Sequence, residues 1–277
     1  MEKKSKIIWQ NLTLTIVVLF LILAGSMYYL NFLSTSWEFS NLRFRQATGQ
    51  VQSNYPSEVI NLTNWKLTLP TGNYKDPDEI KQPELENYVI DPWFIVSSRQ
   101  NAIRFRAPVN GVTTKGSNYP RTELREMTDD GKSKASWSST WGRHTMFIDQ
   151  AITAVPWIKK QVVAGQIHDS EDDVIVIRLD YPKLYINVDG KNKYTLEQKY
   201  QLGKRFKLRF EVEEGRTKIY YNGSRQPVYI LSKKYSEAYF KAGAYSQSNC
   251  QKELIFLCHN RNYGEVLLYQ LSVSHET

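Results

Sequence analysis

Apolar and polar residues alternate one by one along much of this chain. The clearest example is Arg205–Glu213, in which charged residues alternate with Phe206, Leu208, Phe210 and Val212. A repeat of two residues is the period of a half-buried β-strand. The same kind of pattern predicts further strands at Asn64–Leu69, Phe94–Ser97, Ala102–Arg106, Gln161–His168, Val174–Leu179, Leu184–Val188, Thr217–Tyr221, Tyr239–Gln247 and Glu265–Val273.

The pattern leaves little room for helices in the larger part of the chain. No stretch after residue 57 keeps a long period of 3.6 residues, and Ser232–Ala238 would form a helical turn at most. We expect the first strand to stop at Pro70-Thr71-Gly72, and we expect loops at 73–87 and 115–120. Trp137–Ile148 would hold one or two strands. Frequent short strands with turns between them predict an all-β protein, a jelly-roll β-sandwich of two antiparallel sheets.

The N-terminal region follows a different pattern. Lys3, Lys4 and Lys6 precede a run from Leu12 to Leu33 that contains no charged residue. At a rise of about 1.5 Å per residue, such a run is long enough to cross a bilayer as a helix. We therefore predict a transmembrane anchor in residues 1–33, with the lysines in the cytoplasm.

The anchor prediction sets the domain boundaries and the location of the protein. Residues 34–56 are polar and without a period, which indicates a linker, and residues 57–277 form the β domain. This domain would lie outside the cytoplasm, in the periplasm or the extracellular space. The alternative is secretion after cleavage of a signal peptide, which we favour less because the apolar run is long and bulky residues follow L-A-G-S.

The charge of the chain restricts its partners. A formal net charge of +8 points to an anionic partner, such as a nucleic acid, an anionic lipid or an acidic polymer. The chain lacks a helical basic region, zinc-finger spacing and an RNP-like aromatic motif, so we expect no nucleic acid. Aromatic residues make up 13% of the chain, which suits sheets and sugar-binding surfaces alike.

The cysteines and histidines give two further predictions. Cys250 and Cys258 are the only cysteines, and their close spacing in an exported protein predicts one disulfide, with two buried free thiols as the alternative. The four histidines show no metal-ligand spacing, so no metal is expected at them. The acidic run from Asp169 to Asp173 is expected to be a solvated loop, with a Ca²⁺ site as the less favoured alternative.

Three of the expected strands carry an unusual set of polar residues on one face. The strands are Tyr239–Gln247, the segment R-T-E-L-R and the segment Q-I-H. In this order, their shared faces hold Tyr239, Lys241, Gly243, Tyr245 and Gln247, then Arg121, Glu123 and Arg125, then Gln166 and His168. Laid side by side, these strands would form one polar floor, which few structural needs explain.

One reaction needs this set of side chains. A uronic acid polymer can be cleaved without water when a base removes the proton on C5 and the C4–O bond then breaks. The site must hold a developing carboxylate dianion with donors such as Arg and Gln, and it needs a base and an acid. Arg121, Gln166, His168 and Tyr245 match these needs, since His can be a base at neutral pH and nearby cations can lower the pKa of a Tyr.

The same three segments resemble a known family. R-T-E-L-R-E, Q-I-H and Y-F-K-A-G-A-Y-S-Q, in this order, look like the three signature motifs of the polysaccharide lyase family 7 alginate lyases. W-K-L-T-L-P near residue 65 is similar to the first strand of that family. The resemblance covers about residues 57–275. It implies a jelly roll with a concave cleft, and cleavage of alginate by β-elimination to 4,5-unsaturated oligosaccharides.

The resemblance also implies residue roles. Arg121 and Gln166 would neutralise the substrate carboxylate, His168 would assist or act as base, and Tyr245 would be the acid and could also be the base. Substrate contacts are expected from Glu123, which orients the arginines, and from Arg125, Tyr239, Lys241 and Gln247. Ile167 between the motif Gln and His resembles the guluronate-preferring members. No metal or cofactor is expected to take part, and we expect a monomer.

Alternatives remain at this point. Arg125 could be an exposed ion-pair partner of Glu123, Tyr239 could serve only packing, and His168 could be structural. The domain could be a module that binds acidic polysaccharide without cleaving it, or a lyase for another polyuronate such as glucuronan. A glycoside hydrolase would need two carboxylates at the cleft, and Glu123 has no evident partner in the other motifs.

Overall fold

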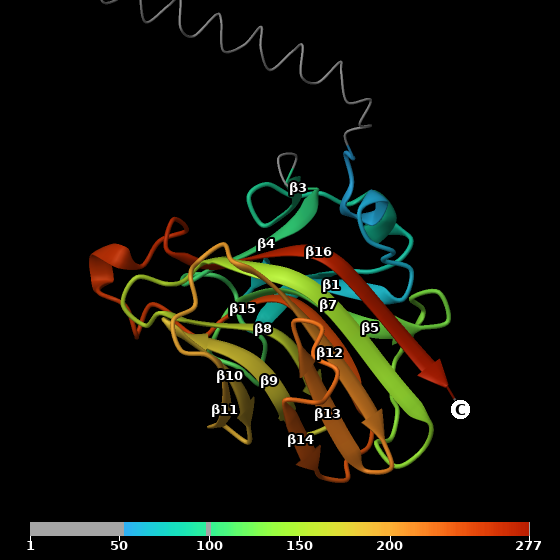
Figure 1. Ribbon diagram of the computed structural model, residues 1–277. Coiled ribbons are helices and arrows are strands. Elements are labelled where there is room, and N and C mark those ends of the chain that lie inside the picture. Colours follow the sequence, from blue (N-terminus) through green and yellow to red (C-terminus); the bar gives the residue numbers. More distant parts are fainter. Residues whose placement is uncertain (1–52, 98–100, 277) are drawn as a thin grey trace, which may run out of the picture. The chain divides into compact units, whose positions relative to one another are not determined.

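The computed structural model describes residues 53–97 and 101–276, which form one compact unit with all its strands in two sheets (Figure 1). The predicted membrane anchor and most of the predicted linker lie outside the described residues. Within those two ranges, no helix is long and apolar enough to cross a membrane.

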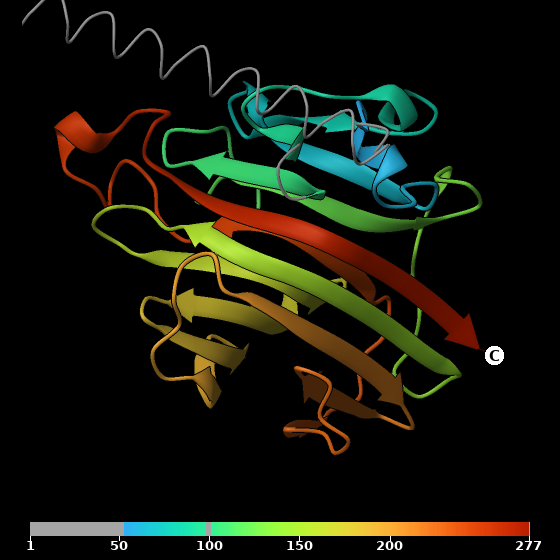
Figure 2. The same cartoon turned by 45° about the horizontal axis from the view of Figure 1, so that its top comes forward.

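Two antiparallel sheets make up the domain, as the sequence predicts (Figures 1 and 2). The nine-stranded sheet runs in the order β11 (Lys191–Glu197), β10 (Lys183–Val188), β9 (Asp173–Asp180), β8 (Gln161–His168), β15 (Tyr239–Ser246), β5 (Arg121–Thr128), β1 (Trp65–Asn73) and β2 (Asp76–Ile80), and β6 (Ser133–Lys134) pairs with β5. The seven-stranded sheet runs in the order β14 (Tyr229–Ser232), β13 (Arg216–Tyr221), β12 (Arg205–Glu213), β7 (Arg143–Ala154), β16 (Tyr263–Glu276), β4 (Ala102–Pro108) and β3 (Phe94–Ser97). The described helices are short 3₁₀ turns, η1 (Pro56–Glu58), η2 (Glu84–Asn87) and η3 (Ile255–Leu257).

The core lies between the sheets and is built from alternate residues of each strand. On β12, all four apolar residues of the alternating pattern are buried. On the three strands that carry the polar motifs, the buried apolar residues are those that alternate with the motif residues, namely Leu124, Ile167, Phe240, Ala242 and Ala244. Each Å² of apolar surface buried on this side stabilises the fold by about 25 cal/mol. Because this side supplies the packing, the opposite side of the same strands can carry polar groups.

The structure corrects two local predictions. β1 does not stop at Pro70 but continues to Asn73, because β2 pairs with it at the edge of the sheet, from Asp76 to Ile80, where a loop was expected. Pro77 is compatible with β2 because an edge strand leaves one row of amides unpaired. Two other predictions are compatible with the structure: Ser232–Ala238 contains no helical turn, and of the one or two strands expected at Trp137–Ile148 the structure has one, β7, which begins at Arg143.

Candidate active site

The three polar motifs lie on three neighbouring strands, because β15 runs between β8 and β5. Tyr239 is opposite His168, and Lys241 is opposite both Gln166 and Arg125. Farther along β15, Gly243 is opposite Glu123 and Tyr245 is opposite Arg121. Residues directly opposite on adjacent strands point to the same side of a sheet. The predicted polar floor therefore exists, with Arg121, Glu123, Arg125, Gln166, His168, Tyr239, Lys241 and Tyr245 on one side.

Glu123 is the centre of this polar floor and is almost fully buried, with 1% of its surface exposed. Its Oε2 accepts from Lys241 Nζ at 2.6 Å and from Arg121 Nη1 at 3.2 Å, and its Oε1 accepts from Gln166 Nε2 at 2.5 Å. One carboxylate thus fixes a side chain from each of the three strands. These bonds agree with the predicted orienting role of Glu123 toward Arg121, and they occupy three of the roughly four lone-pair sites of the carboxylate.

The buried charges change each other's protonation. Burial raises the pKa of the Glu123 carboxyl, but the charges of Lys241 and Arg121 and two hydrogen bonds outweigh burial, so the pKa stays below its usual value. Burial and the nearby Arg121 charge lower the pKa of Lys241 to about 8. Lys241 therefore carries its positive charge at neutral pH and loses it in mildly alkaline solution.

This titration gives a pH prediction. Because Lys241 is positive only below about pH 8, kcat/KM on alginate, the substrate that the motifs predict, should fall as the pH rises through that value. In Lys241→Arg the charge persists, and the alkaline decline should move to higher pH. Steady-state rates measured between pH 6 and 10 test this, with Lys218→Arg in the other sheet as the control. An alkaline decline at the same pH in Lys241→Arg and the native enzyme would refute the assignment.

Tyr245 is half-buried at the end of β15 and has two defined contacts. Its hydroxyl lies 2.8 Å from Ser117 Oγ, and the guanidinium of Arg121 lies over its ring, with Cζ 3.8 Å from the ring centroid. The guanidinium of Arg121 is therefore held against the phenol at the end of β15. No sequence motif indicated Ser117, because it lies in the loop before β5.

His168 ends β8, and one of its ring nitrogens keeps a lone pair. Its Nδ1 lies 2.7 Å from the carbonyl oxygen of Asp169, which can only accept, so Nδ1 carries the proton and Nε2 holds a lone pair. Among the described residues no hydrogen bond reaches Nε2. Burial, and to a smaller extent the Lys241 charge, lowers the pKa of His168, which keeps the ring neutral at pH 7.

Arg125 and Tyr239 contact each other beside His168, and Arg125 is not the ion-pair partner of Glu123 that one alternative expected. Arg125 does not pair with Glu123; its guanidinium donates to the carbonyls of Glu126 at 2.8 Å and Ala135 at 3.4 Å and lies 3.9 Å from the Tyr239 ring centroid. Tyr239 in turn stacks on His168, with centroids 5.3 Å apart. Burial raises the pKa of Tyr239 more than the Arg125 charge lowers it, contrary to the general expectation for a Tyr beside cations. Tyr239 therefore supports the ring of His168, and Arg125 supports the ring of Tyr239.

Gly243 is required by the close approach of β15 and β5. Its φ is +134°, and a Cβ there would lie 2.6 Å from the Thr122 carbonyl oxygen and 2.9 Å from Glu123 Cα. The register between β15 and β8 shifts between Lys241 and Tyr245. The glycine thus lets the strand bend at the centre of the polar floor without displacing Glu123.

Two further predictions concern the end of β15. Gln247 follows the strand and is half-buried; its side chain donates only a long hydrogen bond of 3.5 Å to Ser246, so its substrate contact stays a prediction. Cys250 and Cys258 form the predicted disulfide.

The acidic run lies between β8 and β9. Its residues 170–172 are exposed, and Asp173 begins β9. No group of three or more His, Cys, Asp or Glu among the described residues is arranged to hold a metal ion.

A second polar cluster, built on the buried side chains of Glu126 and His144 and not indicated by the sequence, lies on the other side of β5. Glu126 accepts from Trp137 Nε1 at 3.1 Å and is 2.5 Å from His275 Nε2, while His275 Nδ1 is 2.7 Å from His144 Nδ1. These residues line a cavity of about 720 Å³ that does not include the polar floor. Since β5 belongs to one sheet and β7 and β16 to the other, the cluster joins the two sheets. The expected concave cleft over the polar floor stays a prediction.

Comparison with known proteins identifies the family. A profile described as alginate lyase matches residues 60–275. The crystal structure of the alginate lyase from Corynebacterium sp. has a TM-score of 0.78 and 46% identity to this chain, and the match covers 82% of this chain and 100% of that one. Alginate lyase AlgAT5 from polysaccharide lyase family 7 has a TM-score of 0.76 and 48% identity, with 81% and 100% covered.

A more distant relative has been solved with a ligand. Alginate lyase A1-II′, in a form with one histidine changed to asparagine and one tyrosine changed to phenylalanine, is in complex with substrate (GGMG); it has a TM-score of 0.67 and 26% identity, with 81% and 97% covered. No match is found among curated proteins. The fold and the profile together define a polysaccharide lyase. The chain belongs to the alginate lyase family and is an alginate lyase.

Proposed function

We propose that the polar floor cleaves 1,4-linked uronate chains by β-elimination, and that Arg121, Gln166, His168 and Tyr245 carry the reaction. The observation that supports this most is the strand order β8, β15, β5, which gathers the four side chains on one side of one sheet. The complex of alginate lyase A1-II′ with substrate supports an alginate oligomer as the ligand. The form used in that complex lacks one histidine and one tyrosine, the residue types to which we assign proton transfer.

The first step is recognition of the carboxylate beside C5. Arg121 donates a hydrogen bond from Nη1 to Glu123, and its buried Nε has no hydrogen-bond partner among the described residues. Gln166 Nε2 uses one of its two hydrogens on Glu123. Arg121 and Gln166 therefore keep donors for an incoming carboxylate, while Lys241 adds positive charge beneath it. Such donors stabilise the dianion that forms when C5 loses its proton.

The second step moves two protons. His168 Nε2 takes the C5 proton, the electron pair forms the C4=C5 bond, and the C4–O bond breaks. Tyr245 gives its hydroxyl proton to the departing oxygen, and the Arg121 guanidinium over its ring stabilises the phenolate that remains. The histidine then releases its proton and the tyrosine regains one from water. Glu123 stays ionised and holds Arg121, Gln166 and Lys241 in place.

We propose guluronate as the preferred residue at the cleaved bond. In guluronate the C5 hydrogen and the C4 oxygen are on opposite sides, so separate groups must act as base and acid. His168 lies beside the first residue of β15 and Tyr245 near its last, which supports approach from two directions. Ile167, whose identity suggested this preference, is fully buried in the core and can act only through packing.

The test is absorbance during digestion of alginate. Elimination leaves a conjugated C4=C5 bond, so ultraviolet absorbance should rise, and it should rise faster on poly-guluronate than on poly-mannuronate. A hydrolase would release reducing ends without an absorbance gain, and a binding module would do neither. A rise on glucuronan but not on alginate would reassign the substrate, and equal rates on both alginate blocks would refute the guluronate preference alone.

We also propose that the domain acts outside the cytoplasm as a monomer, held by residues 1–33 or secreted. The Cys250–Cys258 disulfide supports an oxidising compartment.

A further inference from the structure

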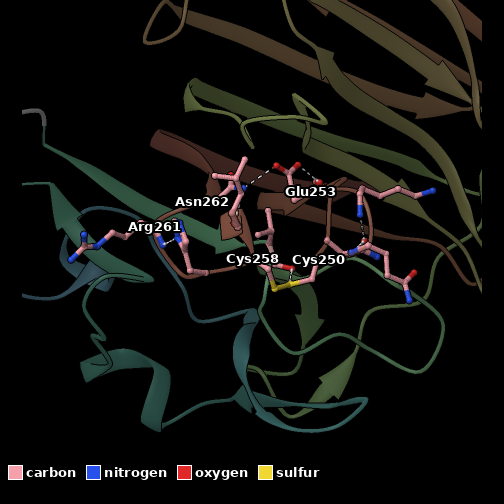
Figure 3. The surroundings of a disulfide bond; sticks show 12 residues. Cys250, Glu253, Cys258, Arg261 and Asn262 are labelled. Carbon is pink, nitrogen blue, oxygen red and sulfur yellow. Dashed lines mark hydrogen bonds between the residues drawn. A yellow bond between two sulfur atoms is a disulfide. The ribbon is translucent and has the colours of Figure 1, made fainter. Parts of the chain in front are cut away.

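The loop between β15 and β16 is a rigid unit with a buried anchor (Figure 3). The Cys250–Cys258 disulfide closes it, and it contains η3. The buried Glu253 carboxylate accepts hydrogen bonds from the backbone amides of Ile158 and Lys159, both at 3.0 Å, from Ser248 Oγ at 2.6 Å and from Asn262 Nδ2 at 2.9 Å. The loop and the turn between β7 and β8 are therefore held together as one surface.

This surface exposes large apolar side chains. Ile255 is 91% exposed and Phe256 70%, and Leu254, Trp157 and Ile158 are each about half exposed. The ring of Trp157 meets His259 edge-on at 5.4 Å, which ties the turn to the loop. The loop projects from one edge of the domain, opposite the C-terminal end of β16 (red in Figures 1 and 2). Single exposed apolar residues are common, but a contiguous group on a rigid projection indicates a binding surface.

The side chains around these apolar residues carry a net positive charge, which indicates an anionic partner. The two segments carry four cations, Lys159, Lys160, Lys252 and Arg261, and one carboxylate, the buried Glu253, which gives a net charge of +3. Arg261 points away from the disulfide in Figure 3. Apolar side chains at a tip, a Trp beside them and Lys and Arg around them suit the boundary between headgroups and acyl chains of an anionic bilayer.

We propose that residues 157–160 and 250–262 dock the domain on an anionic lipid surface. Ile255 and Phe256 enter the interface, and the exposed Lys160, Lys252 and Arg261 contact the headgroups, while Lys159 donates to the Tyr119 hydroxyl at 2.8 Å. A stable protein partner would need about 800 Å² of contact on each side, more than five side chains offer. A polyuronate carries a carboxylate on every sugar and offers only narrow C–H faces, which do not match five large apolar side chains. No residue of the polar floor takes part, so this binding is independent of the proposed reaction.

The test uses residues 53–277, which lack the predicted anchor. A domain of this extent folds by itself, since the match covers the whole solved chain of the Corynebacterium enzyme. We expect it to sediment with phosphatidylcholine vesicles that contain about one third phosphatidylserine, and much less with phosphatidylcholine alone. The double variant Ile255→Ser/Phe256→Ser should reduce the bound fraction at least about tenfold.

The control is Ile230→Ser on β14, an isoleucine that is 49% exposed and outside the loop. It should bind vesicles like the native domain. Both variants should keep the melting temperature and the activity on soluble alginate, which shows that they fold. The proposal is overturned if the native domain does not bind anionic vesicles or if the double variant binds as well. It is also overturned if the loop instead mediates a dimer, seen by sedimentation without lipid and lost in the double variant.

Discussion

Tyr245→Phe should lower kcat on alginate by about a thousandfold and leave KM within about threefold of the native value. The change removes one oxygen, and with it the proton that we assign to the departing sugar oxygen. The ring stays, so the stacking of Arg121 at 3.8 Å and the packing at the end of β15 are retained. Steady-state absorbance rates over a range of alginate concentrations give both constants.

A matched control is available in the other sheet. Tyr220 is also half-buried and also carries a guanidinium on its ring, that of Arg209, with Cζ 3.6 Å from the centroid. Tyr220→Phe should leave kcat and KM unchanged, because it removes the same atom from the same kind of contact outside the polar floor. Near-native kcat in Tyr245→Phe would mean that another group protonates the leaving oxygen.

Glu123→Ala should destabilise the domain by about 3–5 kcal/mol, besides abolishing activity. The substitution leaves Lys241 and Arg121 buried side by side without a counter-charge, and it removes the acceptor that holds Gln166. Both effects follow from one carboxylate serving three strands. Urea unfolding followed by tryptophan fluorescence measures the loss at pH 7, where Lys241 is still charged.

Glu213→Ala is the control for that measurement. Glu213 pairs with Lys218 at 2.5 Å, a separation close to the 2.6 Å of Glu123 and Lys241, but its side chain is partly exposed. A solvated pair of this kind contributes at most about 1 kcal/mol. If Glu213→Ala and Glu123→Ala lower the free energy of unfolding equally, the buried ion pairs of Glu123 do not stabilise the domain more than a solvated pair does.

The fold was predictable where alternation was strong. The period of two in β12 gave its limits and its buried face, and all-β architecture with two antiparallel sheets followed from many such segments. Sequence alone could not find β2, because an exposed edge strand needs no apolar face and reads as a charged loop. It also placed the end of β1 too early, since pairing with β2 outweighs the local preference of Pro70 and Gly72 for a turn.

The polar floor was predictable because its residues alternate with core residues within each motif. What the motifs could not give was the order of strands, and hence which side chains meet. Tyr239 faces His168, and Arg125 binds backbone carbonyls rather than Glu123. Ser117 and the cluster of Glu126, His144 and His275 depend on contacts between segments far apart in sequence, which no local pattern encodes.

The most direct test of the account is a crystal structure of Tyr245→Phe with an alginate oligosaccharide bound. We expect one uronate carboxylate against Arg121 and Gln166, the C5 hydrogen of that sugar facing His168 Nε2, and the glycosidic oxygen facing the ring at position 245. An oligosaccharide bound on another surface, or one whose carboxylate points away from Arg121 and Gln166, would contradict it.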